Sequence, residues 1–210
     1  MKIYKPKSNC LKNDEIMEIA AWLEKGAIMI YPTETIYGIG CNVFDKKAVE
    51  KIYKIKERSC GQISSVMVDS VEKISEYAKV GALEREFVNR NLPGPVTIIL
   101  ELKEKYRDLF SPMTINEVGG VGFRVVKNIP YMTKIAKKCG FPIISTSANL
   151  SGVGVEKTSS EYVMSFFKEK VDMIDILIDA GDMGENLPSA VVDITKTPYQ
   201  IIRRGENLIL

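Results

Sequence analysis

The segment FPIISTSANLSG, residues 141–152, decides the fold because a short apolar run is followed directly by a polar loop. Residues 141–145 form the apolar run, which predicts a buried strand. Residues 145–152 are small or polar except for Leu150, and this composition predicts a loop. In open α/β sheets, ligands bind at loops beyond the carboxyl ends of strands. The segment therefore predicts either a ligand-binding loop or an ordinary turn with a helix cap.

Helical and extended patterns alternate along the rest of the chain, without an internal repeat or an evident linker. Apolar residues at helical spacing predict helices over 14–25, 46–56, 81–91 and 131–139. Short apolar or β-branched runs predict strands over 27–31, 36–40, 66–68, 96–102, 121–126, 175–179, 190–194 and 199–203. The alternation indicates an α/β fold, and short connections between the last strands favour a mixed sheet. We therefore expect a single domain over residues 1–210.

Local signals add three expectations to this outline. Asp45 is placed to cap the helix that begins at residue 46. Thr158 and Glu161 fit a capping box at the start of a further helix. Residues 103–120 are the least regular stretch, and they predict either a surface excursion or a mobile flap over a pocket.

Histidine is absent from the 210 residues, which excludes nucleophiles activated by imidazole and histidine-ligated metals. The four cysteines show no C-x-x-C spacing, which indicates reduced thiols in a cytoplasmic protein. The net charge of +2 is too small to indicate nucleic-acid binding by itself. No apolar run approaches the roughly 20 residues that a membrane span needs. Catalysis by positioning and charge stabilisation, or by Asp, Glu, Lys or Tyr, remains open.

Two cations, Lys56 and Arg58, lie two residues apart at the end of the helix predicted over 46–56. On an extended chain their side chains would share a face. A guanidinium fork and a compact ammonium would then clamp phosphate oxygens. The alternative is a solvated helix end, where cations also favour the helix dipole. The spacing alone favours that alternative because K-x-R is common.

Polar side chains also follow or interrupt other predicted strands. Thr33 and Thr35 either face alike at a strand end or belong to a turn in which Glu34 is solvated. Arg124 lies within an apolar run, where a buried cation needs an acidic partner or a bound anion. The alternative is an edge strand from which Arg124 faces water.

Seven motifs occur in a specific order along the chain: YPTETIYGIG at 31–40, KER at 56–58, PGPVT at 93–97, VGFR at 121–124, SANLSG at 147–152, PSAVVD at 188–193 and IIRRG at 201–205. Together they resemble the YrdC-like family of threonylcarbamoyl-AMP synthases, in its short single-domain form, over nearly the whole chain. The resemblance implies a twisted mixed α/β sheet with flanking helices and a large basic concave face.

The resemblance implies a nucleotidyltransferase that joins L-threonine, bicarbonate and ATP to give threonylcarbamoyl-AMP and pyrophosphate. That product feeds threonylcarbamoyladenosine modification of tRNA, so the implied partners include tRNA or double-stranded RNA and downstream tRNA-modification proteins in the cytoplasm, without a membrane. The residues that would contact L-threonine are Thr33, Arg124, Ser145 and Ser189. The residues that would contact ATP are Lys56, Arg58, Ser147, Asn149 and Arg203.

The implied chemistry suits a chain without histidine. A carbamate is already an anion, so its attack on the α-phosphorus needs no strong base. Catalysis is then alignment plus neutralisation of phosphate charge by Lys56, Arg58 and magnesium carried on ATP. No metal site of the protein itself is expected, because Asp179, Asp182 and Asp193 fit structural roles better.

Several positions depart from the family's usual pattern. Ser59 stands where proline usually follows K-x-R, Gly120 stands where threonine often precedes V-G-x-R, and Ala190 replaces a usual threonine. Residues 62–67 lack the histidine often found there. The departures keep two alternatives open: an RNA-binding or nucleotide-binding paralogue without synthase activity, and carbamoyl transfer to another acceptor.

Overall fold

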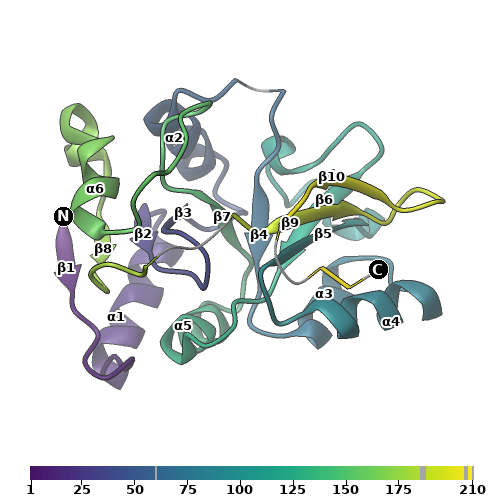
Figure 1. Cartoon of the computed structure of the whole chain (residues 1–210), viewed down its shortest axis with the longest axis horizontal. Helices are drawn as coiled ribbons and strands as arrows, with labels where there is room; N and C mark the ends of the chain where they lie inside the picture. Colours follow the sequence, from purple (N-terminus) through teal and green to yellow (C-terminus); the bar gives the residue numbers. More distant parts are fainter. Residues whose placement is uncertain (60, 185–187, 206–207, 210) are drawn as a thin grey trace.

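The computed structural model describes residues 1–59, 61–184, 188–205 and 208–209. Within these ranges ten strands form one sheet (Figure 1). The strands are β1 (Lys2–Tyr4), β2 (Met29–Tyr31), β3 (Gly38–Gly40), β4 (Ser65–Met67), β5 (Val96–Glu101), β6 (Gly120–Arg124), β7 (Ile143–Ser147), β8 (Ile176–Ile178), β9 (Ala190–Asp193) and β10 (Gln200–Arg203). Every predicted strand is present, with ends within two residues of the predicted ones, whereas β1 was not predicted.

The sheet is mixed, as the short connections predicted. Its strand order is β1-β8-β2-β3-β7-β4-β6-β5-β9-β10. The parallel neighbours are β1 and β8, β2 and β8, β4 and β6, and β5 and β9. The other neighbours are antiparallel, including the β9–β10 hairpin, which projects at the right of Figure 1. The α/β fold with a mixed sheet is therefore confirmed.

The described α-helices are α1 (Asn13–Glu24), α2 (Lys46–Lys56), α3 (Val71–Tyr77), α4 (Ala82–Asn91), α5 (Pro130–Cys139) and α6 (Ser160–Ser165), and the 3-10 helices are η1 (Glu104–Tyr106), η2 (Pro112–Thr114) and η3 (Lys168–Met173). The predicted ends of α2 are confirmed, and Asp45 Oδ1 accepts a hydrogen bond from the backbone N–H of Ala48 at 3.0 Å. The sequence did not predict α3, because two turns show too little periodicity. No described helix has the length and apolar character needed to cross a membrane.

The two faces of the sheet pack against different helices. On one face, Ile30 and Ile144 join a core with buried residues of α2, α3 and α4. On the opposite face, Met29 and Ile143 join a second core with α1 and α5, which lie together in Figure 1. Among the described residues, this second core includes side chains of β1, β2, β4, β7 and β8 but none of β5, β6, β9 or β10. The α1–α5 pair therefore leaves that end of its face without a helical cover.

The predicted capping box at Thr158 is wrong by one residue. The helix α6 begins at Ser160, and the Ser159 hydroxyl accepts a hydrogen bond from the backbone N–H of Tyr162 at 3.2 Å. The Thr158 hydroxyl instead donates to Asp182 Oδ1 at 2.8 Å. Two adjacent hydroxyl residues compete for the cap, and the long-range carboxylate decides between them.

The irregular segment 103–120 is packed onto the sheet rather than lying over a pocket as a flap. Its Phe110 is fully buried, with ring centroids 5.5 Å from Phe44 and 5.7 Å from Tyr77. Two backbone hydrogen bonds fix the residues just after Phe110, from Ser111 N to Val43 O at 3.3 Å and from Ser64 N to Met113 O at 3.0 Å. The ring of Phe110, packed against Phe44 and Tyr77, therefore anchors the segment.

Replacing Phe110 with alanine should lower the free energy of unfolding by about 3–5 kcal/mol, because it removes a fully buried ring. Leu109→Ala is the matched control, since Leu109 is 49% exposed, and its change should stay within about 0.5 kcal/mol. Denaturant titrations of both variants give the comparison. Equal, small losses in the two variants would show that the segment is not anchored by its aromatic residue.

Candidate functional site

A cavity of about 610 Å³ lies where the carboxyl end of β7 meets the start of β9 and the strand β10. Its lining comes from the 33–38 loop, from β4, β5, β6 and β7, from residues 149–155, and from the β9–β10 hairpin. These segments are far apart in the sequence, and sheet order brings them together. The loop after β7, for which the sequence left a ligand-binding loop and an ordinary turn open, therefore borders a cavity.

Alternate residues of the strands line the cavity, because successive side chains of a strand point to opposite faces. Ser145 lies two residues after Ile143, which belongs to the α1–α5 core, so both project from that face. Gly122 and Arg124 line the cavity from β6, and Thr97 and Ile99 line it from β5. The cavity therefore occupies the part of the α1–α5 face that none of the described helices covers.

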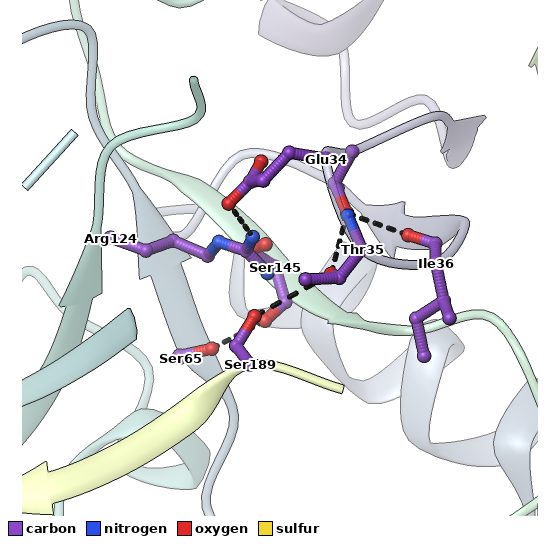
Figure 2. Close-up of polar contacts among 8 residues, drawn as sticks. Glu34, Thr35, Ile36, Ser65, Arg124, Ser145 and Ser189 are labelled. Carbon is purple, nitrogen blue, oxygen red and sulfur yellow. Dashed lines mark hydrogen bonds and ion pairs between the residues drawn. The ribbon is translucent and has the colours of Figure 1, made fainter. Parts of the chain in front are cut away.

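Arg124 carries a buried positive charge into the cavity. Its Nη2 lies 2.8 Å from Glu34 Oε1, and the side chains of Arg124 and Glu34 are 9% and 11% exposed (Figure 2). The strand β6 lies between β4 and β5 rather than at an edge. Both alternatives from the sequence, a solvated Glu34 and an edge-strand Arg124, are therefore wrong, and the predicted acidic partner is present.

Hydroxyl groups surround this ion pair. Thr33 and Thr35 form a turn rather than an extended segment, with their hydroxyl oxygens 2.9 Å apart. The Thr33 hydroxyl also donates to the Ile36 carbonyl at 2.7 Å. The Thr35 hydroxyl lies 3.5 Å from that of Ser189, and Figure 2 shows Thr35, Ser145 and Ser189 beside the arginine. Residues from three separate motifs, together with Ser145 of β7, therefore meet within one small volume.

Three buried polar atoms in this cluster have no hydrogen-bond partner among the described residues: Arg124 Nε, Glu34 Oε2 and Ser145 Oγ. Buried polar atoms in folded proteins are almost always paired, because an unpaired one costs about 1–3 kcal/mol. The cluster thus offers unused donors and an unused acceptor beside a cavity, which is the arrangement expected of a site that a polar ligand completes.

Lys56 lies behind the cavity wall rather than in it. The chain is not extended between the two cations, because Lys56 ends α2 and Glu57 adopts a left-handed conformation with φ of 52°. The Lys56 ammonium is buried and donates to the carbonyl oxygens of Ser147 and Asn149, the latter at 2.8 Å. Burial, together with the positive charge of Arg58, lowers the pKa of Lys56 to about 7.

Arg58 also contacts the end of β7. Its guanidinium donates to Thr146 Oγ1 at 2.8 Å and to the carbonyl oxygen of Ile63 at 2.6 Å. Arg203 lines the cavity and donates to the Ser189 carbonyl at 2.8 Å. Burial lowers the pKa of Arg203, and so do the charges of Arg124 and Arg58. The charged residues in the described lining are both arginines, which agrees with the predicted basic concave face.

The structure brings together most of the residues singled out from the sequence. Those that line the cavity are Thr33, Arg124, Ser145, Ser147, Asn149, Ser189 and Arg203. Lys56 and Arg58 lie outside the lining but bond to Ser147, Asn149 and Thr146, which belong to it.

Sequence reasoning missed Ser65, Thr97 and Gly122 in the lining, and Glu34 as the partner of Arg124. The alternation of residues along β5 and β6 could have indicated Thr97 and Gly122, once the face was known. No local signal pairs Glu34 with an arginine 90 positions away.

The departures at Ser59, Gly120 and Ala190 do not contribute to the cavity lining. At Gly120, the backbone N–H donates to Asn116 Oδ1 at 2.6 Å, and an added Cβ would lie 2.8 Å from Ile99 Cγ2. The absence of a threonine there therefore reflects a tight local turn. Within residues 62–67, Ile63 and Ser65 do line the cavity.

The three aspartates that the sequence left as structural each bind the chain around them. Asp179 Oδ1 accepts from the Ser160 hydroxyl at 2.6 Å, and Asp193 Oδ1 accepts from the Thr195 hydroxyl at 2.6 Å. Asp182 accepts from Thr158, as described above. Across the described ranges, no three cysteine or carboxylate side chains gather in a metal-binding arrangement.

Comparisons with known proteins agree with the motifs. A family model for Sua5, YciO and YrdC proteins, described as "Telomere recombination", matches residues 21–205. A relative from Methanocaldococcus jannaschii, named as a putative threonylcarbamoyl-AMP synthase, is 33% identical over 209 residues, which cover 98% of this chain and 92% of the relative.

Two solved structures share the fold. Pyrococcus abyssi Sua5 complexed with L-threonine superposes with a TM-score of 0.85 at 28% identity, over 98% of this chain and 58% of that one. Escherichia coli YciO superposes with a TM-score of 0.82 at 25% identity, over 98% of this chain and 96% of that one. This chain therefore spans only about 58% of the Sua5 chain but nearly all of YciO. It belongs to the Sua5/YciO/YrdC family.

Proposed function

We propose that the protein is an ATP-dependent nucleotidyltransferase that makes L-threonylcarbamoyl-AMP from L-threonine, bicarbonate and ATP, releasing pyrophosphate. The product would serve threonylcarbamoyladenosine modification of tRNA in the cytoplasm. The observation that carries the proposal is the cluster of unpaired buried atoms beside Arg124, in a cavity whose charged lining is cationic. The relatives named threonylcarbamoyl-AMP synthase support it.

The Arg124 end of the cavity suits an α-amino acid. Arg124 Nε and Ser145 Oγ are unused donors for a carboxylate, and Glu34 Oε2 is an unused acceptor for an amino group. Thr33 and Ser189 would contact the remaining polar groups of L-threonine from the same cluster. Sua5 of Pyrococcus abyssi has been solved with L-threonine, which supports this choice of amino acid.

The Ser147 end suits a nucleotide with its phosphates. The Ser147 hydroxyl and the Asn149 amide line the cavity beyond the carboxyl end of β7, where α/β sheets bind ligands. Arg203 and the neighbouring Arg58 would neutralise phosphate charge. Lys56 also lies at this end, because its ammonium donates to the carbonyl oxygens of Ser147 and Asn149. A volume of about 610 Å³ is in the range of small-molecule sites.

The reaction needs little from the protein beyond alignment and charge. The amine of threonine forms a carbamate with carbon dioxide from bicarbonate. A carbamate oxygen then attacks the α-phosphorus of ATP, and pyrophosphate leaves with the electron pair of the broken P–O bond. Arg203 lines the cavity, and Arg58 donates to Thr146, which lines it beside the phosphate end. The two arginines would stabilise negative charge that grows on the pyrophosphate.

Magnesium would enter with ATP as part of the substrate. The cavity lining supplies hydroxyl and amide oxygens, and none of its described residues is a carboxylate. That donor set suits a cation already held by phosphate oxygens, since Mg²⁺ commonly binds substrate phosphates and keeps several waters. The protein would then orient the phosphates rather than provide the metal site.

Replacing Gly122 with alanine should weaken L-threonine binding about tenfold, because overpacking costs roughly 1–3 kcal/mol. The added Cβ would lie 2.9 Å from Thr97 Cγ2 and 3.2 Å from Ser65 Cβ, at the cavity floor. Calorimetric titration with threonine measures the change. Gly61→Ala is the control, because nothing lies within 4 Å of its added Cβ. Equal affinities in the two variants would place the amino acid elsewhere.

Isothermal titration with ATP, with and without L-threonine, tests whether the two ligands share the cavity. We expect each ligand to strengthen binding of the other, because ATP and L-threonine would occupy adjoining ends of one cavity. Reciprocal strengthening is a thermodynamic requirement once either effect exists. Independent binding of the two ligands would contradict a joint site.

The second candidate is an RNA-binding or nucleotide-binding member of the family without synthase activity. The nearly full-length match to Escherichia coli YciO, an uncharacterized protein, favours keeping it. This candidate predicts tight tRNA binding that weakens steeply with salt. A flat titration with tRNA at low salt would reject its RNA-binding form.

A further inference from the structure

We propose that Lys56 is a positioning residue whose buried ammonium holds the 147–151 turn in the shape that presents Ser147 and Asn149 to a ligand. The identity of that ligand, the phosphate-bearing part of ATP, rests on the proposed function. The holding of the turn does not, because it is a property of the ligand-free protein. The proposal differs from a direct contact between Lys56 and phosphate.

Every donor of the Lys56 ammonium is already used inside the protein. A lysine ammonium has three N–H donors. In the structure they face Ser147 O, Asn149 O at 2.8 Å and Asn149 Oδ1 at 3.2 Å. Lys56 is only 1% exposed and does not line the cavity. The ammonium therefore binds the turn from within the protein rather than from the cavity.

The turn also bonds back to the helix that carries Lys56. The backbone N–H of Ser151 donates to the Lys56 carbonyl at 2.9 Å. On the helix side, Lys170 Nζ donates to the Ile55 carbonyl at 3.2 Å and pairs with Glu57 at 2.6 Å. These contacts hold the end of α2 in place. Lys56 joins that end to the turn twice, as a donor through its ammonium and as an acceptor through its backbone carbonyl.

Lys56 also sets the orientation of the Asn149 amide. Asn149 Oδ1 accepts from Lys56 Nζ and from the Ser147 hydroxyl at 2.6 Å, so it is the oxygen that faces the cation. The Asn149 Nδ2 then donates to the Val153 carbonyl. A flipped amide would place two N–H donors against an ammonium. The positive charge therefore selects one arrangement of the turn.

Removing the cation would leave the Asn149 carbonyl oxygen without its donor, and it would leave the Ser147 carbonyl oxygen with the backbone N–H of Asn149, at 3.1 Å. Unpaired buried acceptors are costly, so the turn should open locally to reach water. The rest of the sheet has no such dependence on Lys56. The loss should therefore be confined to the turn and to the ligand that it binds.

Hydrogen exchange on the ligand-free full chain tests this directly, with Lys56→Met as the variant. We expect amide exchange in residues 147–151 to rise about tenfold or more, with other segments unchanged. Lys54→Met is the matched control, because Lys54 is exposed on the same helical turn. Lys56→Gln, which keeps a donor, serves if the methionine variant does not fold, and it should show a smaller rise.

Ligand titrations separate the outcomes. With the turn loosened, we expect the dissociation constant for ATP to rise about tenfold and that for L-threonine to stay unchanged. Loss of ATP affinity in a Lys56→Met, Asn149→Ala double variant should be smaller than the product of the single losses. If the two single losses of ATP affinity multiplied in full in the double variant, Lys56 would contact the ligand independently of Asn149, and that result would overturn the proposal.

Unchanged exchange in residues 147–151 would also overturn the proposal, whatever happens to ATP binding. So would a uniform rise across the sheet, since that indicates a merely structural role. A rise confined to the turn in a protein that never binds ATP would support the positioning role and reject the proposed function. The two hypotheses therefore fail separately.

Discussion

Replacing Arg124 with glutamine should raise the KM for L-threonine by roughly 100-fold, because a hydrogen bond to a charged group contributes up to about 3 kcal/mol. Arg124 is 7% exposed and extends from β6 into the cavity. Its Nε has no partner among the described residues, and its Nη2 is already paired with Glu34. A carboxylate ligand would supply the missing acceptor. Initial rates over a range of threonine concentrations give the KM.

The variant also removes the partner of a buried carboxylate, so folding must be separated from binding. Breaking a buried ion pair leaves an uncompensated charge, which destabilises a protein strongly. A Glu34→Gln, Arg124→Gln double variant restores neutrality and should recover stability without recovering threonine affinity. Arg90→Gln is the surface control, because Arg90 pairs with Glu86 in an exposed ion pair. A double variant with normal KM would remove Arg124 from the amino-acid site.

Replacing Arg58 with alanine should lower the turnover number by at least roughly 100-fold, the usual effect of deleting one electrostatic donor from an active site. Three contacts fix its guanidinium: Thr146 Oγ1 at 2.8 Å, Ile63 O at 2.6 Å and Gln62 O at 3.1 Å. A preorganised cation needs no rearrangement when charge moves onto the leaving pyrophosphate. Its charge also acts on Arg203, which lines the cavity.

Single-turnover measurements distinguish this effect from weaker ATP binding. At saturating ATP the loss should persist, because the positive charge acts on the transition state more than on the bound substrate. Arg85→Ala is the matched control, since Arg85 is exposed on α4. Turnover close to normal at saturating ATP in the Arg58 variant would exclude Arg58 from the chemical step.

The sequence predicted the parts of the fold that local chemistry determines. The bounds of α2 follow from one apolar stripe and the Asp45 cap, and both are present. A sharp change of composition at Ser145 predicted the strand β7 and a polar turn after it, although β7 runs two residues past the predicted end, to Ser147. The ordered motifs placed seven of the nine predicted contact residues in one cavity lining.

Features that depend on tertiary packing were not predictable from the sequence. Glu34 meets Arg124 only because β3, β7, β4 and β6 lie side by side. The left-handed conformation of Glu57 ends α2 between Lys56 and Arg58, which an extended interpretation of K-x-R cannot show. The burial of Lys56 against carbonyl oxygens of a turn 91 positions away likewise has no local signal. Positions of charged side chains are therefore the least predictable part of the site.

Release of pyrophosphate from ATP tests the central claim most directly. The account predicts that purified protein with magnesium releases pyrophosphate only when ATP, bicarbonate and L-threonine are all present, with threonylcarbamoyl-AMP as the matching product. Pyrophosphate release that is indifferent to threonine, or none with all three present, would contradict it.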